Sequence, residues 1–508
     1  MVNIVVELSK YLMIIMMAVY AYECFAVFNY REDARRQRMF RRQNILMFAI
    51  HFIAFLVMYL QTEEIRMIGF YAMQVVLFLA IILLYTRIYP KISRLVVNNM
   101  CMLLAVGFIM ITRISYDSAV KQFLIVAGAS ALGLLVPIII RKWKALSQWR
   151  VFYGVAGVIS LALVIVVGRV SGGAMLGFDI AGISVQPSEL VKLIFVFFVA
   201  ASLKTDTSFR NVVITTAVAA AHVLILVVSR DLGAALIIFV VYLVMLYVAT
   251  RQPLYALAGL AAGSVASVAA YYLFSHVRVR VIVWRDPFAA YEEGGYQVAQ
   301  ALMAIGTGGW FGMGLFQGAA DQIPVAESDF IFAAMAEEMG IIFSLCVILV
   351  CLSVYVMFLN IAMQLRNQFY KLVALGLGTC YMVQSFLNIG GVIKFIPSTG
   401  VTLPLVSYGG SSLLSTIIMF GIIQGLYLLR EDEEDDIERK KAEQLRDGRA
   451  GQRAHEPSGR KQAGPVRGVA AASATELPAS KGTGRKRTKT AGKKATAQKR
   501  REKKTGSK

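Results

Sequence analysis

Charged residues are scarce in this chain. Only 16% of its 508 residues are Asp, Glu, Lys or Arg, whereas about a quarter of the residues in a soluble domain are charged. Hydrophobic residues make up 57% of the sequence, and the mean hydropathy is +0.63. This balance excludes an ordinary soluble protein and indicates a membrane protein with many spans.

Histidine and cysteine, which bind zinc in many enzymes, are also scarce. The four histidines have no metal-ligand spacing, and neither an HExxH motif nor a phosphate-binding P-loop is present. All five cysteines lie in apolar segments without a CxxC spacing, which favours packing as small apolar side chains over disulfides or zinc binding. The sequence therefore points away from zinc hydrolases and P-loop enzymes.

Long apolar runs are what the sequence does contain. A run of about 17–25 apolar residues can cross a bilayer as a helix. The first run lacks a basic leader and a small-residue cleavage site, so we expect a retained span rather than a signal peptide. The sequence predicts an all-α polytopic membrane protein with thirteen spans, near residues 5–28, 45–60, 67–85, 97–113, 121–140, 151–169, 188–203, 211–228, 232–249, 253–274, 331–358, 371–389 and 404–429.

The loops between these runs alternate in charge. Basic loops such as 29–43 and 141–150 alternate with less basic ones such as 170–189 and the long segment 275–330. The positive-inside rule then puts the basic loops and the C-terminus in the cytoplasm, and the other loops and the N-terminus outside. The net charge of +21 comes from these loops and the tail, so we expect no nucleic-acid partner.

The tail, residues 431–508, differs in kind from the rest. It opens with "EDEEDD", becomes strongly basic near its end ("KKATAQKRREKK"), and has no apolar periodicity. Such a segment cannot bury enough apolar surface to offset its ordering entropy, so we expect a disordered basic cytoplasmic tail. It would either keep the end of the chain solvated and set the topology or bind anionic membrane lipids through its charge.

Three polar clusters map to the predicted external side. The first is "QPSELVKL", residues 186–193, where Pro187 opens a helix and Glu189 lies in its first turn. The helix dipole explains the acid but not Lys192, three residues deeper on the same face. We expect an ion pair between Glu189 and Lys192 at membrane depth, where charged groups are usually functional.

The second cluster is the segment 275–330. It places Arg278, Arg280 and Arg285 just outside a span, against the positive-inside trend. Arginine binds phosphate bidentately, so these residues are candidates for binding an anionic ligand. The alternative is that their side chains only extend to the lipid headgroups.

The third cluster, "IPSTGVTLPLVSYGGSSLL" at residues 396–414, runs into the last predicted span. Its prolines and the Gly409–Gly410 pair predict a fixed, non-helical backbone near the membrane surface. Such backbone is tolerated only where protein buries it or water reaches it, so we expect this segment to line a cavity. We count Ser407 of this segment among the candidate substrate-binding residues.

The stretch "VAESDFIFAAMAEEMG", residues 325–340, carries four acids into a predicted span. Asp329 lies at the membrane boundary, and Glu327 is its neighbour. Glu337 and Glu338 lie deeper, and we expect them to pair inside the bundle with Lys192 or Lys394.

Five motifs in this order resemble the SEDS family of bacterial peptidoglycan glycosyltransferases, which includes FtsW, RodA and SpoVE. They are "QPSEL..KL", "DLG.AL", "DPF….GYQ..QA..AIG.GG..G.GL", "DFIFA…EE.G" and "TGVTLPL.SYGGSS". The resemblance covers roughly residues 95–430 and implies a core of ten spans, which matches the last ten predicted here. It leaves residues 1–94 as extra N-terminal helices without an implied role.

The resemblance implies a multi-pass protein of the bacterial cytoplasmic membrane that polymerises lipid II at the outer face, in cell division, elongation or sporulation. It implies Asp329 as the catalytic residue, and Glu189 and Lys192 as residues lining a central cavity. It also implies a class B penicillin-binding protein as partner and makes a divalent metal, Mg²⁺ or Mn²⁺, an expected cofactor. Members of the family usually have His and Thr where this chain has Glu327 and Ser328, so no role is carried to these two positions.

The chemistry fits the same residues. An inverting glycosyl transfer needs one carboxylate to take the proton of the acceptor hydroxyl, and Asp329 is the candidate. The diphosphate leaves without protonation, so it needs charge stabilisation, for which Arg278, Arg280 and Arg285 are candidates. Two alternatives stay open: a flippase that moves lipid II across the membrane, and a non-enzymatic scaffold of a division or elongation complex.

Overall fold

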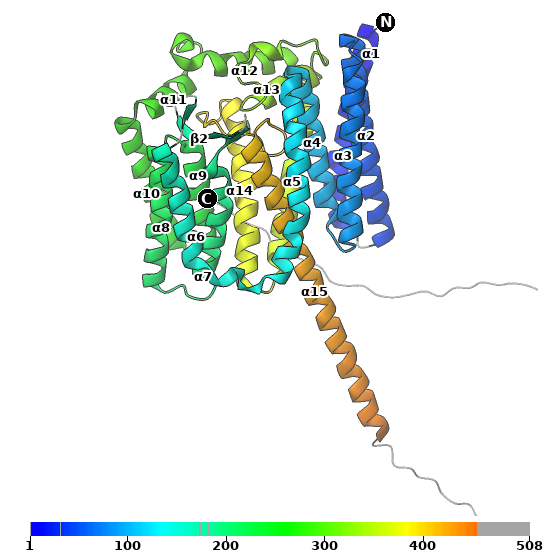
Figure 1. The fold of residues 1–508 in the computed structure, drawn as a ribbon, viewed down its shortest axis with the longest axis vertical. Coiled ribbons are helices and arrows are strands. Elements are labelled where there is room, and N and C mark those ends of the chain that lie inside the picture. Colours follow the sequence, from blue (N-terminus) through cyan, green and yellow to red (C-terminus); the bar gives the residue numbers. More distant parts are fainter. Residues whose placement is uncertain (1, 31, 168, 172–173, 181–182, 455–508) are drawn as a thin grey trace, which may run out of the picture. The chain divides into compact units, whose positions relative to one another are not determined.

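The computed structural model describes residues 2–30, 32–167, 169–171, 174–180 and 183–454. The chain divides into two compact units, residues 1–443 and 444–508. The first unit is a helical bundle in which α11 and α12 lie across one end, drawn at the top of Figure 1. We call this the α11–α12 end of the bundle.

Fifteen α-helices are present in the described residues. Their bounds are α1 Val2–Ala26, α2 Asp33–Thr62, α3 Arg66–Ile88, α4 Arg94–Ile114, α5 Tyr116–Lys142, α6 Arg150–Val167, α7 Pro187–Leu203, α8 Phe209–Val228, α9 Leu232–Thr250, α10 Pro253–Leu273, α11 Ser275–Arg285, α12 Tyr296–Gly308, α13 Ile331–Gln364, α14 Gln368–Val392 and α15 Gly410–Ala454.

The all-helical membrane architecture is confirmed, and eleven of the described helices are long and apolar enough to cross a membrane. The predicted spans 151–169 and 188–203 correspond to α6 and α7, which are shorter, so the count of thirteen stays a prediction. The loop between them adds a small antiparallel sheet that we did not expect. Its strands, in the order β1-β2-β3, are β1 Arg169–Ser171, β2 Ala174–Ile180 and β3 Ile183–Val185.

The last helix differs from the prediction at both ends. It begins at Gly410 rather than near residue 404, because residues 393–409 are non-helical, as their prolines and glycines predicted. It also continues beyond Glu431, where we expected a disordered tail to begin, as far as Ala454. An ion pair between Arg430 and Glu434, one helical turn apart, supports this extension. The rest of the predicted tail, residues 455–508, lies outside the described residues.

Helix α4 is the most enclosed element of the bundle. Every residue from Leu95 to Thr112 is buried, including the polar side chains of Asn98 and Asn99. Its Asn99 accepts a hydrogen bond from the Tyr20 hydroxyl of α1 (3.0 Å) and donates one to the Ser353 hydroxyl of α13 (3.3 Å). The N-terminal helices α1 and α2 pack against α13 and α4, so they are attached directly to the rest of the bundle.

Helix α13 is broken where the sequence predicted a continuous span. Gly340 has φ 87° and ψ 163°, a backbone conformation that is essentially restricted to glycine. The loop after α12 makes the hydrogen bonds that the break leaves open: Met313 and Gly314 donate backbone N–H groups to the carbonyls of Glu337 and Glu338, at 2.9 and 2.8 Å. The backbone N–H of Ile341 donates in turn to the carbonyl of Gly309, at 3.0 Å. A break at membrane depth is tolerated because this loop satisfies its backbone groups.

The break also determines where the deeper acids lie. Glu338 is fully buried and pairs with Arg113 at the end of α4, at 2.8 Å. Glu337 accepts a hydrogen bond from the backbone N–H of Ala319, at 3.1 Å. The predicted pairing of these acids with Lys192 or Lys394 is therefore wrong, because the loop that follows α12 and the end of α4 occupy that side of α13.

Replacing Gly340 by alanine tests the importance of the break. A Cβ at this position would lie 2.5–2.6 Å from backbone atoms of Gly312, Phe311 and Trp310, and the backbone conformation would be strained by about 1–3 kcal/mol in addition. We expect Gly340→Ala to lower the thermal unfolding temperature of the detergent-purified protein markedly.

The matched control is Gly306→Ala. Gly306 lies inside helix α12, and nothing is within 4 Å of the position of an added Cβ. Alanine favours a helix over glycine, so this variant should unfold at the temperature of the parent protein or slightly above it. Equal unfolding temperatures for Gly340→Ala and the parent would contradict the proposed strain.

Candidate functional site

Two neighbouring cavities open among the helices and the non-helical segment before α15. The first has a volume of about 510 Å³, and the second about 460 Å³. Gln186, Asp231, Gly400 and Thr402 line both cavities, so the two share a wall. The first cavity contains Glu189 and Lys192, and the second contains Asp329 and Arg280.

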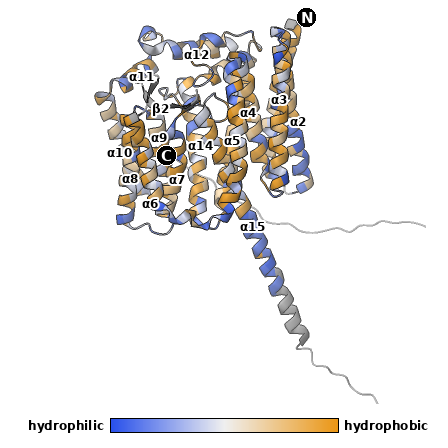
Figure 2. Ribbon diagram, in the orientation of Figure 1, coloured by the Kyte–Doolittle hydropathy of each residue, from blue (hydrophilic) through white to orange (hydrophobic). Residues whose placement is uncertain are grey.

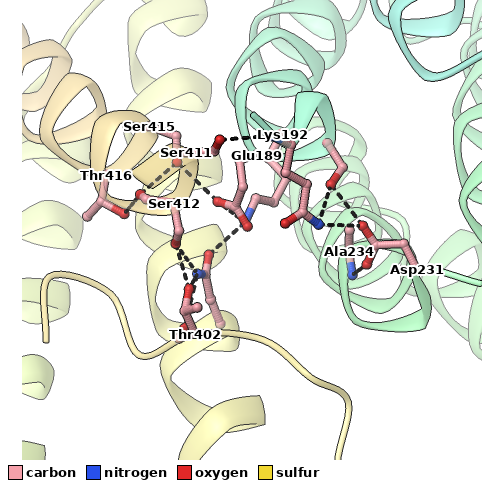
Figure 3. Close-up of polar contacts among 12 residues, drawn as sticks. Glu189, Lys192, Asp231, Ala234, Thr402, Ser411, Ser412, Ser415 and Thr416 are labelled. Carbon is pink, nitrogen blue, oxygen red and sulfur yellow. Dashed lines mark hydrogen bonds and ion pairs between the residues drawn. The ribbon is translucent and has the colours of Figure 1, made fainter. Parts of the chain in front are cut away.

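Glu189 and Lys192 form the predicted ion pair, with a distance of 2.9 Å between the Lys192 Nζ and the Glu189 Oε2. Pro187 opens α7 and places both side chains on one face, three residues apart. Both are buried, and each has a second partner: Lys192 donates to the Gln384 Oε1 (2.7 Å) and the Ser415 hydroxyl donates to Glu189 (3.1 Å). Figure 3 shows the pair between α7 and the helix that carries Ser415.

Gln384 of α14 connects this pair to the non-helical segment. Its side-chain amide donates to the carbonyl of Thr402 and to the hydroxyl of Ser412, both at 3.2 Å. The Thr402 hydroxyl donates to Ser412 as well, at 2.7 Å (Figure 3). The prediction that residues 396–414 line a cavity is therefore confirmed, and Lys192 is linked to that lining through one amide.

Asp231 is a site residue for which the sequence analysis gave no role. It caps α9 by accepting a hydrogen bond from the backbone N–H of Ala234 (3.0 Å). The Ser188 hydroxyl and the Gln186 amide donate to its other oxygen, at 2.8 and 3.0 Å (Figure 3). Its position at the boundary of two apolar runs, within the quoted "DLG.AL" motif, is the signal that could have identified it.

Asp329 and Arg280 approach each other across Gly400. Gly400 has φ +70°, and a Cβ on it would lie 3.6 Å from the Asp329 Oδ2 and 3.8 Å from the Arg280 Nη2. Arg280 also donates to the carbonyl of Ser398, at 2.7 Å. Asn388 donates to the backbone carbonyl of Asp329, at 2.9 Å, which fixes the turn that precedes α13.

Loss of water around the partly buried Asp329 carboxylate raises its pKa. The positive charge of Arg280 and the Ser328 hydroxyl oppose this shift, whereas the charge of Glu327 adds to it. Arg280 is desolvated as well, which lowers its pKa, and the charges of Asp329 and Asp231 oppose that change. A carboxyl group with a raised pKa beside a cation is suited to proton transfer.

Of the three predicted phosphate-binding arginines, only Arg280 lines the second cavity. Arg278 is exposed and donates to the carbonyl of Tyr272, at 3.0 Å, and Arg285 is exposed at the end of α11. A side chain on α11 points to the cavity or away from it according to its position on the helix, and the sequence alone does not show which face of α11 lies toward the cavity. Arg230 and Lys394 line the same cavity and were missed, because they come from loops distant in sequence.

Ser407 lies buried beside the second cavity rather than in its lining. Its hydroxyl donates to the carbonyl of Ser328 and accepts from the backbone N–H of Leu403, at 2.9 Å. It thus connects the non-helical segment to the turn that carries Asp329. Its hydroxyl is therefore occupied by backbone groups, and a role in substrate binding stays a prediction.

The expected Mg²⁺ or Mn²⁺ has no evident set of ligands. Within the described part of the chain, no group of three or more His, Cys, Asp or Glu side chains is gathered closely enough to hold a metal ion. The divalent metal therefore stays a prediction, and we derive no step through one.

Comparisons with known proteins agree with this architecture. A family model described as "Cell cycle protein" (FtsW/RodA/SpoVE) matches residues 93–430. The peptidoglycan glycosyltransferase RodA of Mycobacterium leprae is 32% identical over 363 residues, which covers 66% of this chain and 78% of that protein. A probable peptidoglycan glycosyltransferase FtsW of Saccharophagus degradans is 30% identical over 364 residues, covering 66% of this chain and 93% of that protein.

A solved structure described as the structural coordination of polymerization and crosslinking by a peptidoglycan synthase complex also resembles the chain. It has a TM-score of 0.57 and 25% sequence identity, and the match covers 67% of this chain and 98% of the other. With the family model spanning more than half of the sequence, the chain belongs to the FtsW/RodA/SpoVE family.

Proposed function

We propose that this protein is a peptidoglycan glycosyltransferase that polymerises lipid II into glycan strands at the outer face of the bacterial cytoplasmic membrane. The observation that carries the proposal is the second cavity, where the Asp329 carboxylate, with its raised pKa, lies beside Arg280. Arg230 and Lys394 add cationic side chains to the same cavity. A base and several cations in one cavity are what a transfer from a sugar diphosphate requires.

In the proposed reaction, the acceptor hydroxyl attacks the anomeric carbon of the donor sugar with inversion. Asp329 takes the hydroxyl proton as the new C–O bond forms. The bond between the anomeric carbon and the phosphate oxygen breaks, and its electron pair leaves with the diphosphate. Arg280, with Arg230 and Lys394, stabilises the charge of the leaving diphosphate.

We propose a positioning role for the Glu189–Lys192 pair. The pair lines the first cavity and connects to Thr402, in the wall that both cavities share, through Gln384. A buried ion pair with these additional hydrogen bonds holds α7, α14 and the non-helical segment in one arrangement. Loss of either charge would leave the other buried without its partner.

The proposal has three further parts. The first is a class B penicillin-binding protein as crosslinking partner, in division, elongation or sporulation, which agrees with the synthase complex named above. The second is a cytoplasmic C-terminus, which the basic loops favour. The third is a division of the chain into N-terminal extra helices (1–94), the glycosyltransferase core with its segment 275–330 (95–430) and a tail (431–508), which agrees with the matched range.

Asp329→Asn tests the catalytic assignment. Removing a general base typically slows the chemical step by about 10²–10⁴-fold, so we expect glycan synthesis from purified lipid II to fall by this factor. The control is Asp321→Asn, which removes an exposed carboxylate from the same loop and should leave the rate unchanged.

The parent protein and the Asp329→Asn variant together separate the glycosyltransferase from the flippase and the scaffold. A folded Asp329→Asn protein that polymerises lipid II at the normal rate would contradict the proposed base. Transport of lipid II across liposome membranes, without strand synthesis by the parent protein, would favour the flippase. If the parent protein shows neither strand synthesis nor lipid II transport, but the division or elongation complex still assembles, the scaffold would be favoured.

The pH dependence of kcat/KM tests the electrostatic interaction between Asp329 and Arg280. The base acts only when deprotonated, so activity should fall as the pH drops through its pKa, which burial raises above the usual range of an Asp. Arg280→Gln removes a charge that lowers this pKa. The acidic limb of the profile should therefore move to higher pH in this variant, and the maximal rate should fall.

Arg278→Gln is the matched control for this experiment. It removes the same charge from the same helix, but Arg278 lies outside the cavity. Its profile should coincide with that of the parent protein. Equal losses in the two variants would restore the binding role that the sequence assigned to all three arginines.

A further inference from the structure

A third cavity lies between α1 and α2, in the N-terminal helices that the proposed activity does not use. Its volume is about 320 Å³. It is lined by Tyr22, Ala26, Tyr30, Arg35, Arg38, Met39 and Arg42. The cavity thus combines three arginines, two tyrosines and two apolar side chains.

The arginines come from one face of α2. Positions 35, 38 and 42 are three and seven residues apart, so they share one side of the helix. Tyr22 and Ala26, four residues apart on α1, form the opposite wall. The α2 sequence contains further arginines at 36 and 41 that do not line the cavity, so only part of the basic segment is directed at it.

A buried acid holds one of these arginines in place. Glu23 of α1 is fully buried and forms an ion pair with Arg42. A carboxylate buried in an apolar bundle is costly unless it is paired, so this contact fixes the Arg42 guanidinium at the α1 side of the cavity. Arg35 pairs with the exposed Glu32, at 2.8 Å, and lies over the Tyr30 ring, 5.7 Å from its centroid.

Arg38 is different from its two neighbours. Among the described residues it has neither an ion pair nor a hydrogen bond, although it lines the cavity between them. The cavity therefore carries one positive charge that no carboxylate of the described chain balances. An arginine fork in such a place is suited to bidentate contact with a phosphate.

We propose that this α1–α2 cavity binds a phosphate group, carried either by the headgroup of an anionic phospholipid or by a small soluble phosphate. The cavity lies at the arginine-rich start of α2, where polar sequence gives way to the apolar run, as Figure 2 shows by colour. Basic cavities between membrane helices bind anionic headgroups in this position. Arg38, Arg42 and Arg35 would contact the phosphate, and the tyrosines would flank it.

The simpler explanation is that these arginines only extend into the headgroup region, as basic residues near helix ends commonly do. The two explanations differ for Arg38 and Arg41. Both are exposed arginines of the same turn region of α2, but only Arg38 lines the cavity. If the side chains only extend to the headgroups, removing either charge should reduce phosphate binding equally. If the cavity is a binding site, only the loss of Arg38 should reduce it.

The experiment compares full-length parent protein, Arg38→Gln and Arg41→Gln after delipidation in detergent. Each is incubated with phosphatidylglycerol or phosphatidylethanolamine, and bound lipid is counted by native mass spectrometry. We expect the parent and Arg41→Gln to retain phosphatidylglycerol preferentially. Arg38→Gln should retain about fivefold less, the factor that corresponds to about 1 kcal/mol per basic residue.

A second arm separates the two sources of phosphate. The thermal unfolding temperature of each protein is measured with inorganic phosphate or with chloride at the same ionic strength. Suppose that phosphate raises the unfolding temperature of the parent and of Arg41→Gln but not of Arg38→Gln, and that no protein retains lipid. That result would support the site and identify a soluble phosphate as its ligand. Equal behaviour of Arg38→Gln and Arg41→Gln in both arms would overturn the proposal. Arg38 has no partner in the described chain, so its replacement should leave the fold intact.

Discussion

The break in α13 at Gly340 is the constraint on which the rest of the α11–α12 end depends. A membrane helix cannot leave backbone groups unpaired, so the loop 309–314 must lie along residues 337–342 and supply the missing hydrogen bonds. Once this loop is fixed, the chain has only residues 315–330 in which to return to the start of α13. Asp329 lies at the end of this connecting segment, just before α13. The break at Gly340, eleven residues later, therefore helps to place Asp329 beside the second cavity.

Whether a buried acid already has an ion-pair or hydrogen-bond partner determines whether it is available for catalysis. Glu338 is neutralised by Arg113, Glu189 by Lys192, and the side chain of Asp231 is occupied by three hydrogen bonds. Each therefore stabilises an arrangement of helices. The Asp329 carboxylate instead lies in the lining of the second cavity, with Arg280 across Gly400. The same physical rule, that a buried charge needs a partner, thus separates the supporting acids from the candidate base.

The parts of the site that sequence could predict are those determined by short separations. Glu189 and Lys192 are three residues apart on a helix, so their pairing follows from helical geometry. The non-helical backbone before α15 follows from its prolines and glycines. The partner of Glu338 did not follow, because Arg113 lies on another helix and no local pattern connects the two. Which of Arg278 and Arg280 lines the second cavity depends on the orientation of α11, which the sequence does not show. That Arg230 and Lys394 line the same cavity depends on how distant loops come together.

The N-terminal helices, which the family resemblance leaves without a role, contact the loop that supports the break in α13. Near the start of α1, Lys10 donates to the carbonyl of Gly312 (3.1 Å), in the loop that pairs with the break in α13. Near its end, α1 carries Glu23 and the wall of the arginine-lined cavity. A helix of 25 residues is about 37 Å long, so α1 can reach both places. Helix α1 therefore contacts both the arginine-lined cavity and the loop that pairs with the break in α13.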